Sequence, residues 1–417
     1  MSQVSALRAC GRLKVRVAMD PSISNSALLE GITVLDVTQV MAGPYCAMLL
    51  CDMGADVIKI EPPGGDWTRN LAGAVGAESP AFNAVNRGKR GVVLDLKQRA
   101  AQDVVRRLAR TGDVIIENYR PGVMARFGLD YASLSPDNPQ LIYASISGYG
   151  QTGPDASKGG FDLVAQGVSG LMSITGEPGG APVKVGVPVT DLGAALFALA
   201  GVLAALHARA RTGRGQHIDT SLVESGLALS VWEATEYFAT GGIPQPTGSA
   251  HRLSAPYQAL RCADGYITIG AANDRSFAKL CELLGRTEWT RDPRFTTNAR
   301  RVEHREALAS AIEDITSEKP RAHWLQRLEG AGIPCGPINN YEDVFRDPQV
   351  LAREMLVDID HPVLGWTRAL GTPIKMSGTP LDPRRRAPLL GEHTDEILTE
   401  LGYQTAQIAE LRIRNVI

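Results

Sequence analysis

An α/β fold with a mostly parallel, doubly wound sheet is the architecture that the sequence predicts for residues 31–149. Short runs rich in β-branched residues alternate there with helical segments, a pattern typical of strands joined by right-handed crossovers. The first helical segment ends at Gly54, where a left-handed residue is expected. These observations together predict a Rossmann-like large domain.

The elements of this domain follow one another closely. The first strand is expected at Ile32–Val37, and an apolar helix at Tyr45–Met53 follows it. The later elements are expected to be strand Val57–Glu61, strand Val92–Leu96, helix Ala101–Thr111, strand Val114–Glu117 and strand Leu141–Ile146.

The second half of the chain changes character. A long apolar helix is expected to open at Asp191 and run through Leu206, before strand His217–Leu222 and helix Val223–Phe238. A Gly- and Pro-rich stretch then breaks all periodicity and is interpreted as a linker or active-site loop. The expected organisation is an N-terminal extension (1–27), the large domain (28–240), this loop (241–256), a smaller α/β domain (257–345) and a C-terminal return to the large domain (346–417).

The N-terminal extension is basic at its start, because Arg8, Arg12, Lys14 and Arg16 precede any acidic residue. An organelle-targeting presequence, a disordered extension and a start codon placed too early, with Met19 as the true beginning, all fit this composition.

Composition excludes several classes of protein. A formal net charge of -2 leaves no basic excess for nucleic acid. The six cysteines show no C-x-x-C pair, which favours free thiols in the cytoplasm and argues against a bound metal. The most apolar stretch, Leu192–Leu206, is shorter than the roughly 20 residues of a membrane span, so we expect a buried helix and no membrane partner.

The first strand-to-helix turn, Thr38–Pro44, lacks the G-x-G-x-x-G glycines that let a dinucleotide pyrophosphate approach the backbone. The sequence of this turn therefore argues against a nicotinamide or flavin cofactor.

Asp191 is the main candidate for a catalytic residue. It is a lone carboxylate after the apolar approach Val185–Thr190, at the positive end of a helix. From the residues alone, a helix cap and a poised nucleophile are both consistent with this position.

Several motifs occur in a fixed order along the chain. They are Leu28–Asp36, Ala42–Pro44, Gly54–Glu61, Glu117–Gly122, Ser147–Pro154, Thr212–Gln216, Gly336–Asn339 and Ala387–His393. Together they resemble the class III CoA-transferases, the family of formyl-CoA and carnitine CoA-transferases, and the similarity runs from about Leu28 to the C-terminus. The resemblance implies an interlocked homodimer, with acyl-CoA as a substrate and no tightly bound cofactor.

In that family an aspartate attacks the acyl-CoA thioester to form a mixed anhydride, and the CoA thiolate then makes an aspartyl-CoA thioester. The matching residue here is Asp191, with Asp162 expected as a supporting polar residue beside it. The resemblance therefore favours the nucleophile over the cap.

Racemases of the α-methylacyl-CoA type share the fold and provide the alternative function. They pair the acid with a histidine in a Gly-His-Asp motif, whereas this chain reads Gly160-Phe161-Asp162, so the two-base reaction lacks a partner. A non-catalytic acyl-CoA binding protein is the third possibility.

The resemblance also implies a set of CoA contacts. Lys97 and Arg126 would meet phosphate charge, and Tyr119 would pack against adenine. One phosphate-binding arginine of the family corresponds to Pro63, so Arg69 or Arg90 is expected to replace it. The full set is Gln39, Val40, Ala42, Leu94, Lys97, Asn118, Tyr119, Arg126, Lys158 and Phe161.

The acceptor acid is harder to predict. Oxalate-using members carry a glutamine where this chain has Met41, which makes oxalate doubtful. The sequence looks closest to the branch that uses succinyl-CoA with glutarate, hydroxymethylglutarate or a similar dicarboxylate. Gly248, His251 and Arg252 are the expected contacts for the second carboxylate.

Overall fold

The computed structural model describes residues 27–71, 73–74 and 78–417, so the predictions for residues 1–26 lie outside the described part. Its contacts form two compact units. The first unit contains the described residues up to Ile146, Ala195–Asp219 and Glu354–Ile417, and the second contains Ser147–Ala194 and Thr220–Arg353. The domain boundaries at residues 241 and 257 were predicted from a change in composition. The two units are defined by contacts, so these boundaries stay a prediction.

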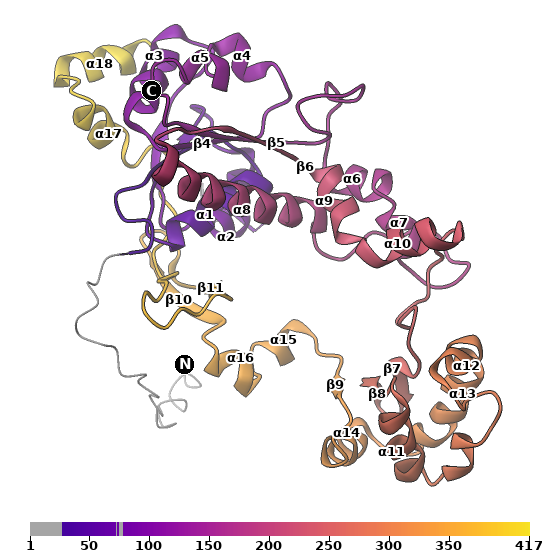
Figure 1. Ribbon diagram of the computed structural model, residues 1–417. Helices are drawn as coiled ribbons and strands as arrows, with labels where there is room; N and C mark the ends of the chain where they lie inside the picture. Colours follow the sequence, from indigo (N-terminus) through magenta and orange to yellow (C-terminus); the bar gives the residue numbers. More distant parts are fainter. Residues whose placement is uncertain (1–26, 72, 75–77) are drawn as a thin grey trace, which may run out of the picture. The chain divides into compact units, whose positions relative to one another are not determined.

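A six-stranded sheet forms the centre of the first unit (Figure 1). Its strand order is β3-β2-β1-β4-β5-β6, the order of a Rossmann-like doubly wound fold. The pairs β1–β2, β2–β3, β1–β4 and β4–β5 are all parallel, which confirms the predicted fold class. The strands are β1 (Thr33–Asp36), β2 (Asp56–Glu61), β3 (Arg90–Val93), β4 (Val114–Glu117), β5 (Ile142–Ser147) and β6 (His217–Ser221).

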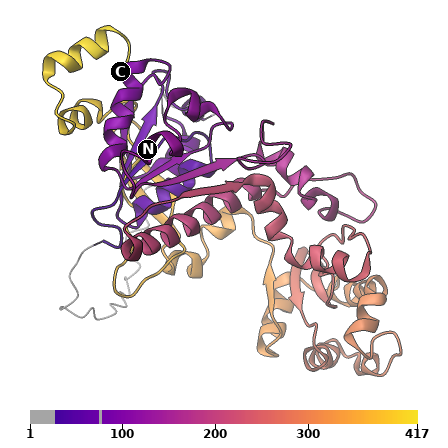
Figure 2. The same ribbon diagram turned by 45° about the horizontal axis from the view of Figure 1, so that its top comes forward.

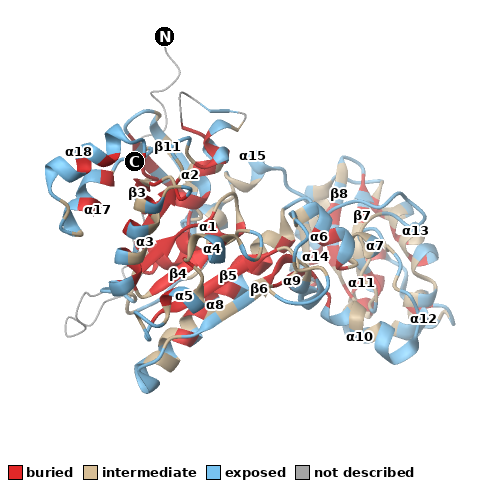
Figure 3. Cartoon of the chain, turned by 90° about the horizontal axis from the view of Figure 1, so that it is seen from above, coloured by how far each residue is buried: buried red, intermediate tan, exposed pale blue. Residues whose placement is uncertain are grey.

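Helices cover both faces of this sheet (Figure 1). Alternate strand residues such as Leu35, Ile58 and Val92 pack with α3, and the last two helices of the chain complete this core beside the sheet (Figures 1 and 2). The inner strands of the sheet are buried, whereas the edge strand β6 is mostly exposed or half-buried, and the outer helix surfaces are exposed (Figure 3). The remaining elements are α1 (Ala42–Asp52), η1 (Trp67–Asn70), α2 (Pro80–Asn86), α3 (Arg99–Thr111), α4 (Val123–Phe127), α5 (Tyr131–Leu134), β10 (Leu356–His361), β11 (Gly365–Leu370), α17 (Thr394–Glu400) and α18 (Thr405–Ile413).

The second unit contains a three-stranded antiparallel sheet with its own apolar core, to which Leu260, Ile267, Phe277 and Trp324 belong. Helix α8 begins in this unit and continues into the first. The elements are α6 (Asp162–Val168), α7 (Leu171–Ile174), α8 (Val189–Thr212), α9 (Leu222–Leu229), α10 (Val231–Thr240), β7 (Tyr257–Cys262), β8 (Gly265–Gly270), α11 (Asp274–Leu284), η2 (Thr287–Thr290), α12 (Asn298–Glu303), α13 (Arg305–Thr316), α14 (Arg321–Gly330), β9 (Cys335–Pro337), α15 (Tyr341–Val344) and α16 (Pro348–Ala352).

Several predicted elements differ from the structure. Strand β3 spans Arg90–Val93 where Val92–Leu96 was predicted, and α1 begins at Ala42 instead of Tyr45. The helix expected at Val223–Phe238 is divided into α9 and α10 at Ser230, whose hydroxyl donates to the Leu227 carbonyl (2.9 Å) and so competes with the helical hydrogen bonds. Helix α8 is also longer than expected, at 24 residues. By length and composition it could cross a membrane, but apolar core helices of other proteins meet the same criteria.

Candidate active site

The N-terminus of α8 is tied to α6 by Asp162. One carboxylate oxygen of Asp162 accepts from the backbone N–H of Thr190 (3.0 Å) and from its hydroxyl (2.8 Å). The other oxygen accepts from the Gln166 side chain (2.7 Å), one helical turn further along α6. Asp162 therefore satisfies a free N–H of the first turn of α8, which is the work of a helix cap.

Asp191 lies in the first turn of α8, after Val189 and Thr190, and so is not itself the cap. Among the hydrogen bonds of the described residues, none involves its side chain. Burial, together with a smaller contribution from the negative charge of Asp162, raises the pKa of the Asp191 carboxyl to about 7. The positive end of the helix dipole opposes this shift, but burial outweighs it.

Gln166 extends this arrangement to the loop before α8. Its side chain is fully buried, and its carbonyl oxygen accepts from the Val185 N–H (2.8 Å). Sequence reasoning missed both Gln166 and Thr190. The i, i+4 spacing of Asp162 and Gln166 on one helix was the signal that could have found Gln166.

The backbones at Gly148 and Gly160 pass each other in close contact, and Gly160 lies two residues before Asp162. A Cβ atom on Gly160 would lie 2.4 Å from the Gly148 Cα, and a Cβ on Gly148 would lie 2.7 Å from the Gly160 Cα. Any larger residue at either position must push the two backbones apart. This contact therefore fixes where α6 begins.

A second group of predicted residues is connected in the first unit. The Asn118 side chain accepts from the Gln39 N–H (2.9 Å) and donates to the Gln39 carbonyl (2.7 Å), while the Gln39 side chain donates to the Tyr119 hydroxyl (3.3 Å). Glu117, which sequence reasoning did not select, accepts from the Tyr119 N–H (2.9 Å). Burial raises the pKa of Glu117 to about 7.

A cleft of about 180 Å³ opens beside this group at the carboxyl ends of the strands, where ligands bind in open α/β sheets. Four of the predicted CoA contacts line it. Val40 and Asn118 are next in sequence to lining residues, Arg126 is exposed next to Phe127, and Ala42 is buried at the start of α1, three residues after Gln39. The lining residues are Gln39, Ile60, Glu61, Pro62, Leu94, Asp95, Leu96, Lys97, Tyr119 and Phe127.

The two arginines expected to replace the family arginine at Pro63 are both committed elsewhere. Arg69 is buried, pairs with Glu61 through Nε (2.7 Å) and stacks on the Phe82 ring. Arg90 begins β3, at the opposite end of the strand from the cleft, and pairs with three carboxylates. The expectation for both residues is wrong, because neither guanidinium is free for a phosphate.

Lys158 and Phe161 lie in the second unit. Lys158 pairs with Asp155 (2.8 Å) on the surface, which raises the pKa of its ammonium group, and Phe161 is exposed directly before α6. Their expected contact with CoA stays a prediction.

Gly248, His251 and Arg252 lie together in the irregular segment 241–256. His251 stacks on Tyr257 (4.9 Å between ring centroids), and Arg252 donates to the Gln245 carbonyl (2.8 Å). Arg305 of α13 donates to the carbonyls of His251 and Arg252, and the Gly248 N–H donates to the Gly176 carbonyl (2.9 Å) in the segment between α7 and α8. Among the hydrogen bonds and ring contacts of the described residues, none joins segment 241–256 directly to Asp191.

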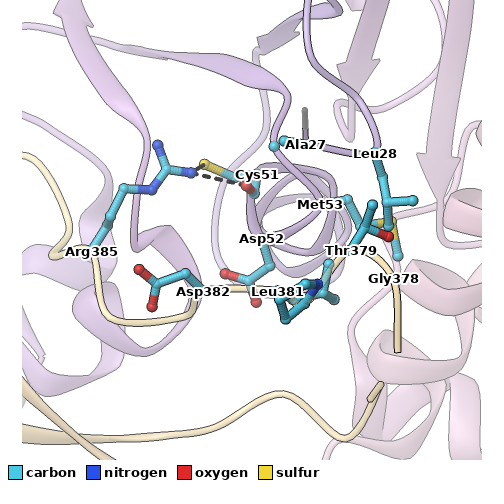
Figure 4. Close-up of a pocket in the computed structure, with 12 residues that line it drawn as sticks. Ala27, Leu28, Cys51, Asp52, Met53, Gly378, Thr379, Leu381, Asp382 and Arg385 are labelled. Carbon is cyan, nitrogen blue, oxygen red and sulfur yellow. Dashed lines mark hydrogen bonds between the residues drawn. The ribbon is translucent and has the colours of Figure 1, made fainter. Parts of the chain in front are cut away.

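A larger cavity of about 460 Å³ lies at the other end of α1 (Figure 4). It is lined by Ala27, by the end of α1 and by residues 378–382, with Arg385 donating to the Cys51 carbonyl (2.9 Å). Burial raises the pKa of the Cys51 thiol to about 11, so it stays protonated and unreactive. The cavity contains none of the predicted site residues, and α1 separates it from the cleft by roughly 16 Å.

Comparison with known proteins identifies the family. The family model described as "CoA-transferase family III" matches residues 29–394. The chain belongs to CoA-transferase family III. It is therefore an enzyme of acyl-CoA metabolism with acyl-CoA and carboxylate substrates. In the described part of the chain, no cluster of three or more His, Cys, Asp or Glu could hold a metal ion.

Relatives of this CoA-transferase act on different acids. The succinate–glutarate CoA-transferase of Agrobacterium fabrum is 42% identical over 381 residues, covering 89% of this chain and 95% of that one. The acetyl-CoA:oxalate CoA-transferase of Acetobacter aceti is 41% identical over 382 residues, covering 91% and 97%. The crystal structure of a CAIB/BAIF family protein from Brucella suis is 43% identical and covers 90% of this chain and 99% of that chain, with a TM-score of 0.81.

Lys97 gives a first test of the cleft. It is exposed, and in the described part of the chain its ammonium group has no ion-pair partner. Lys97→Met is expected to raise the KM for an acyl-CoA about fivefold with little change in kcat, because a phosphate contact would be lost from binding alone. Steady-state kinetics check this, with the exposed Lys319→Met as the control. An unchanged KM would remove Lys97 from the CoA site.

Proposed function

We propose that this CoA-transferase moves CoA from succinyl-CoA to a small dicarboxylic acid such as glutarate or hydroxymethylglutarate, with Asp191 as the covalent nucleophile. The observation that carries the proposal is the state of Asp191. Its carboxyl group has a pKa raised to about 7, while Asp162 satisfies the adjacent helix N–H in its place. A partly desolvated carboxylate that accepts no hydrogen bonds is a stronger nucleophile than one fully solvated by water.

The reaction proceeds through three covalent intermediates on Asp191, namely two mixed anhydrides with an aspartyl-CoA thioester between them. The Asp191 carboxylate attacks the thioester carbonyl, the C–S bond breaks, and CoA leaves as the thiolate with a mixed anhydride left on Asp191. The thiolate then attacks the aspartyl carbonyl of the anhydride, which releases succinate and forms the aspartyl-CoA thioester. The acceptor carboxylate then attacks the aspartyl-CoA thioester, which releases the CoA thiolate and forms a mixed anhydride between the acceptor and Asp191. The thiolate attacks the acceptor carbonyl of this anhydride, which forms the new acyl-CoA and returns Asp191 as a free carboxylate.

The second carboxylate of the acceptor needs a cation, and Arg252 is our candidate. Its Nε is buried and pairs with Glu236 Oε2 (3.6 Å), and one terminal nitrogen donates to the Gln245 carbonyl (2.8 Å). The remaining N–H groups at the tip of the guanidinium are the ones that a ligand carboxylate would use. The Agrobacterium relative, named for succinate and glutarate, supports a dicarboxylate acceptor of this size.

An acceptor panel tests the proposal. The full chain is incubated with succinyl-CoA and, separately, glutarate, hydroxymethylglutarate, oxalate and acetate, and acyl-CoA products are measured by mass spectrometry. We expect the longer dicarboxylates to give the highest kcat/KM. Transfer to acetate alone would contradict the dicarboxylate acceptor. Exchange of the α-proton with deuterated solvent in the absence of transfer would indicate the racemase reaction instead.

The transfer activity is expected to depend on pH, because Asp191 must be ionised to attack the thioester. Only the carboxylate attacks, so kcat/KM for succinyl-CoA should fall as the pH drops below about 7. Asp162→Asn removes the neighbouring negative charge that raises the pKa of Asp191, and the acid limb should therefore move to lower pH. pH–rate profiles of the wild type and variant check this. A limb that stays in place or moves upward would contradict the assignment.

A further inference from the structure

The turn between β1 and α1 is held by side chains. The Thr38 N–H donates to Asp36 Oδ1 (3.0 Å), and the Thr38 carbonyl accepts from Lys59 Nζ. The Val40 N–H donates to Asp66 Oδ2 (3.2 Å). With the two Asn118 bonds to the intervening residue, five successive backbone groups of this turn each bind a side chain.

Val40 has an unusual backbone conformation in this turn. Its φ is +72°, in the left-handed region that β-branched residues rarely adopt. Such a conformation persists only where the surrounding structure imposes it. The hydrogen bond to Asp66 holds the N–H of Val40 itself, and the hydrogen bond from Lys59 holds the carbonyl of Thr38, two residues earlier.

The partners are themselves fixed. Lys59 is fully buried, with Nζ 3.5 Å from Asp66 and 3.8 Å from Asp36, and Lys89 pairs with Asp36 (2.7 Å). Asp66 also accepts from the Thr68 N–H (3.0 Å), so it cannot turn away without losing the cap of η1. Removing one member of such a buried charged group leaves the others uncompensated.

We propose that Lys59 and Asp66 are positioning residues for coenzyme A. They hold Val40 in its left-handed conformation, and this fixes the backbone on either side of Gln39 at the wall of the cleft. The inference rests on the proposed function and takes the cleft, which four of the predicted CoA contacts line, as the place where that CoA binds. A preorganised turn binds more tightly because its ordering cost is already met in the free protein.

A double-mutant cycle tests this role. In Asp66→Asn, Oδ1 can still cap η1 but the amide group cannot accept from the Val40 N–H, so the strained turn should relax. The Kd for free coenzyme A, measured by calorimetry on the full chain, is expected to rise roughly tenfold. Val40→Gly makes the same φ accessible without strain. In that background Asp66→Asn should change the Kd less than about twofold.

The matched control is Asp52→Asn, which alters another buried carboxylate that pairs with Arg87 (2.6 Å), away from the turn. It should lower the Tm without changing the Kd for CoA. An equal loss of affinity from Asp66→Asn in both backgrounds would overturn the positioning role, since a general structural defect would not be rescued by Val40→Gly.

If Asp66→Asn does not fold, Val40→Gly alone still tests whether the turn is strained. It keeps the five hydrogen bonds and releases the backbone strain, which should exceed the extra conformational entropy that glycine gives the unfolded chain, so the Tm is expected to rise by about 2 °C or more. A fall in the Tm would overturn the claim that the turn is strained. Failure of the wild type to bind CoA would overturn the proposed function and this role with it, whereas wild-type binding with unchanged affinity in Asp66→Asn would overturn the role alone.

Discussion

Asp191→Asn is expected to lower the rate of CoA transfer at least roughly 10,000-fold, the scale seen when a covalent nucleophile is removed. The asparagine amide is close in size to the carboxylate but cannot form the anhydride. Because Asp162 and not Asp191 satisfies the Thr190 N–H, the substitution leaves the N-terminus of α8 intact.

The same variant is expected to be more stable than the wild type at pH 8. The pKa of Asp191 is raised from 3.8 to about 7 in the folded protein, so the folded state disfavours the carboxylate relative to the unfolded chain. Asparagine removes this cost, which is about 1–4 kcal/mol. The difference should be absent below the unfolded value of 3.8 and complete above about 7.

Calorimetric Tm values across this pH range, together with transfer assays, check both parts. Asp137→Asn, at an exposed acid paired with Arg110 (3.3 Å), is the control and should change neither quantity much. Substantial residual transfer would contradict the nucleophile. A lower Tm at pH 8 would instead indicate that Asp191 has a capping role.

Gly160→Ala is expected to have the second-largest effect. Its Cβ would lie 2.4 Å from the Gly148 Cα, a separation that the backbone cannot accommodate without moving. The displacement passes directly to Asp162, two residues later, and so to the N-terminus of α8. We expect a loss of transfer of at least about 100-fold and a lower Tm, because both a backbone contact and a buried hydrogen-bond group are disturbed.

Gly186→Ala is the matched control in the same unit, since a Cβ there meets nothing within 4 Å. It should keep near-normal transfer and Tm. Wild-type activity in Gly160→Ala would show that the crossing of the two glycines does not position the carboxylates.

Much of the fold could be predicted because its signals are local. Strand Val114–Glu117 is a run of apolar residues ending in one acid, and the structure has a strand with the same limits. Gly54 ends α1 with a φ of +99°, as expected for a left-handed residue. The cleft residues Gln39, Leu94, Lys97 and Tyr119 were also predicted, but through family resemblance and not through pattern.

The parts that escaped prediction depend on partners distant in sequence. Lys59 interrupts an apolar strand and would be taken for an exposed residue, yet its partner Asp36 lies 23 positions earlier on the adjacent strand. Arg69 was expected to meet phosphate because the family arginine is replaced by Pro63, but in the fold it pairs with Glu61 and donates to the Pro388 carbonyl, 319 positions later in the chain. Charge type can be read from a sequence, whereas charge pairing requires the topology.

Trapping the covalent intermediate tests the central claim most directly. The enzyme is mixed with succinyl-CoA, quenched with hydroxylamine within one turnover, digested and analysed by mass spectrometry. The account predicts a hydroxamate on Asp191 and no such modification in Asp191→Asn. Steady formation of product with no modified peptide at any quench time, or modification at another carboxylate, would contradict it.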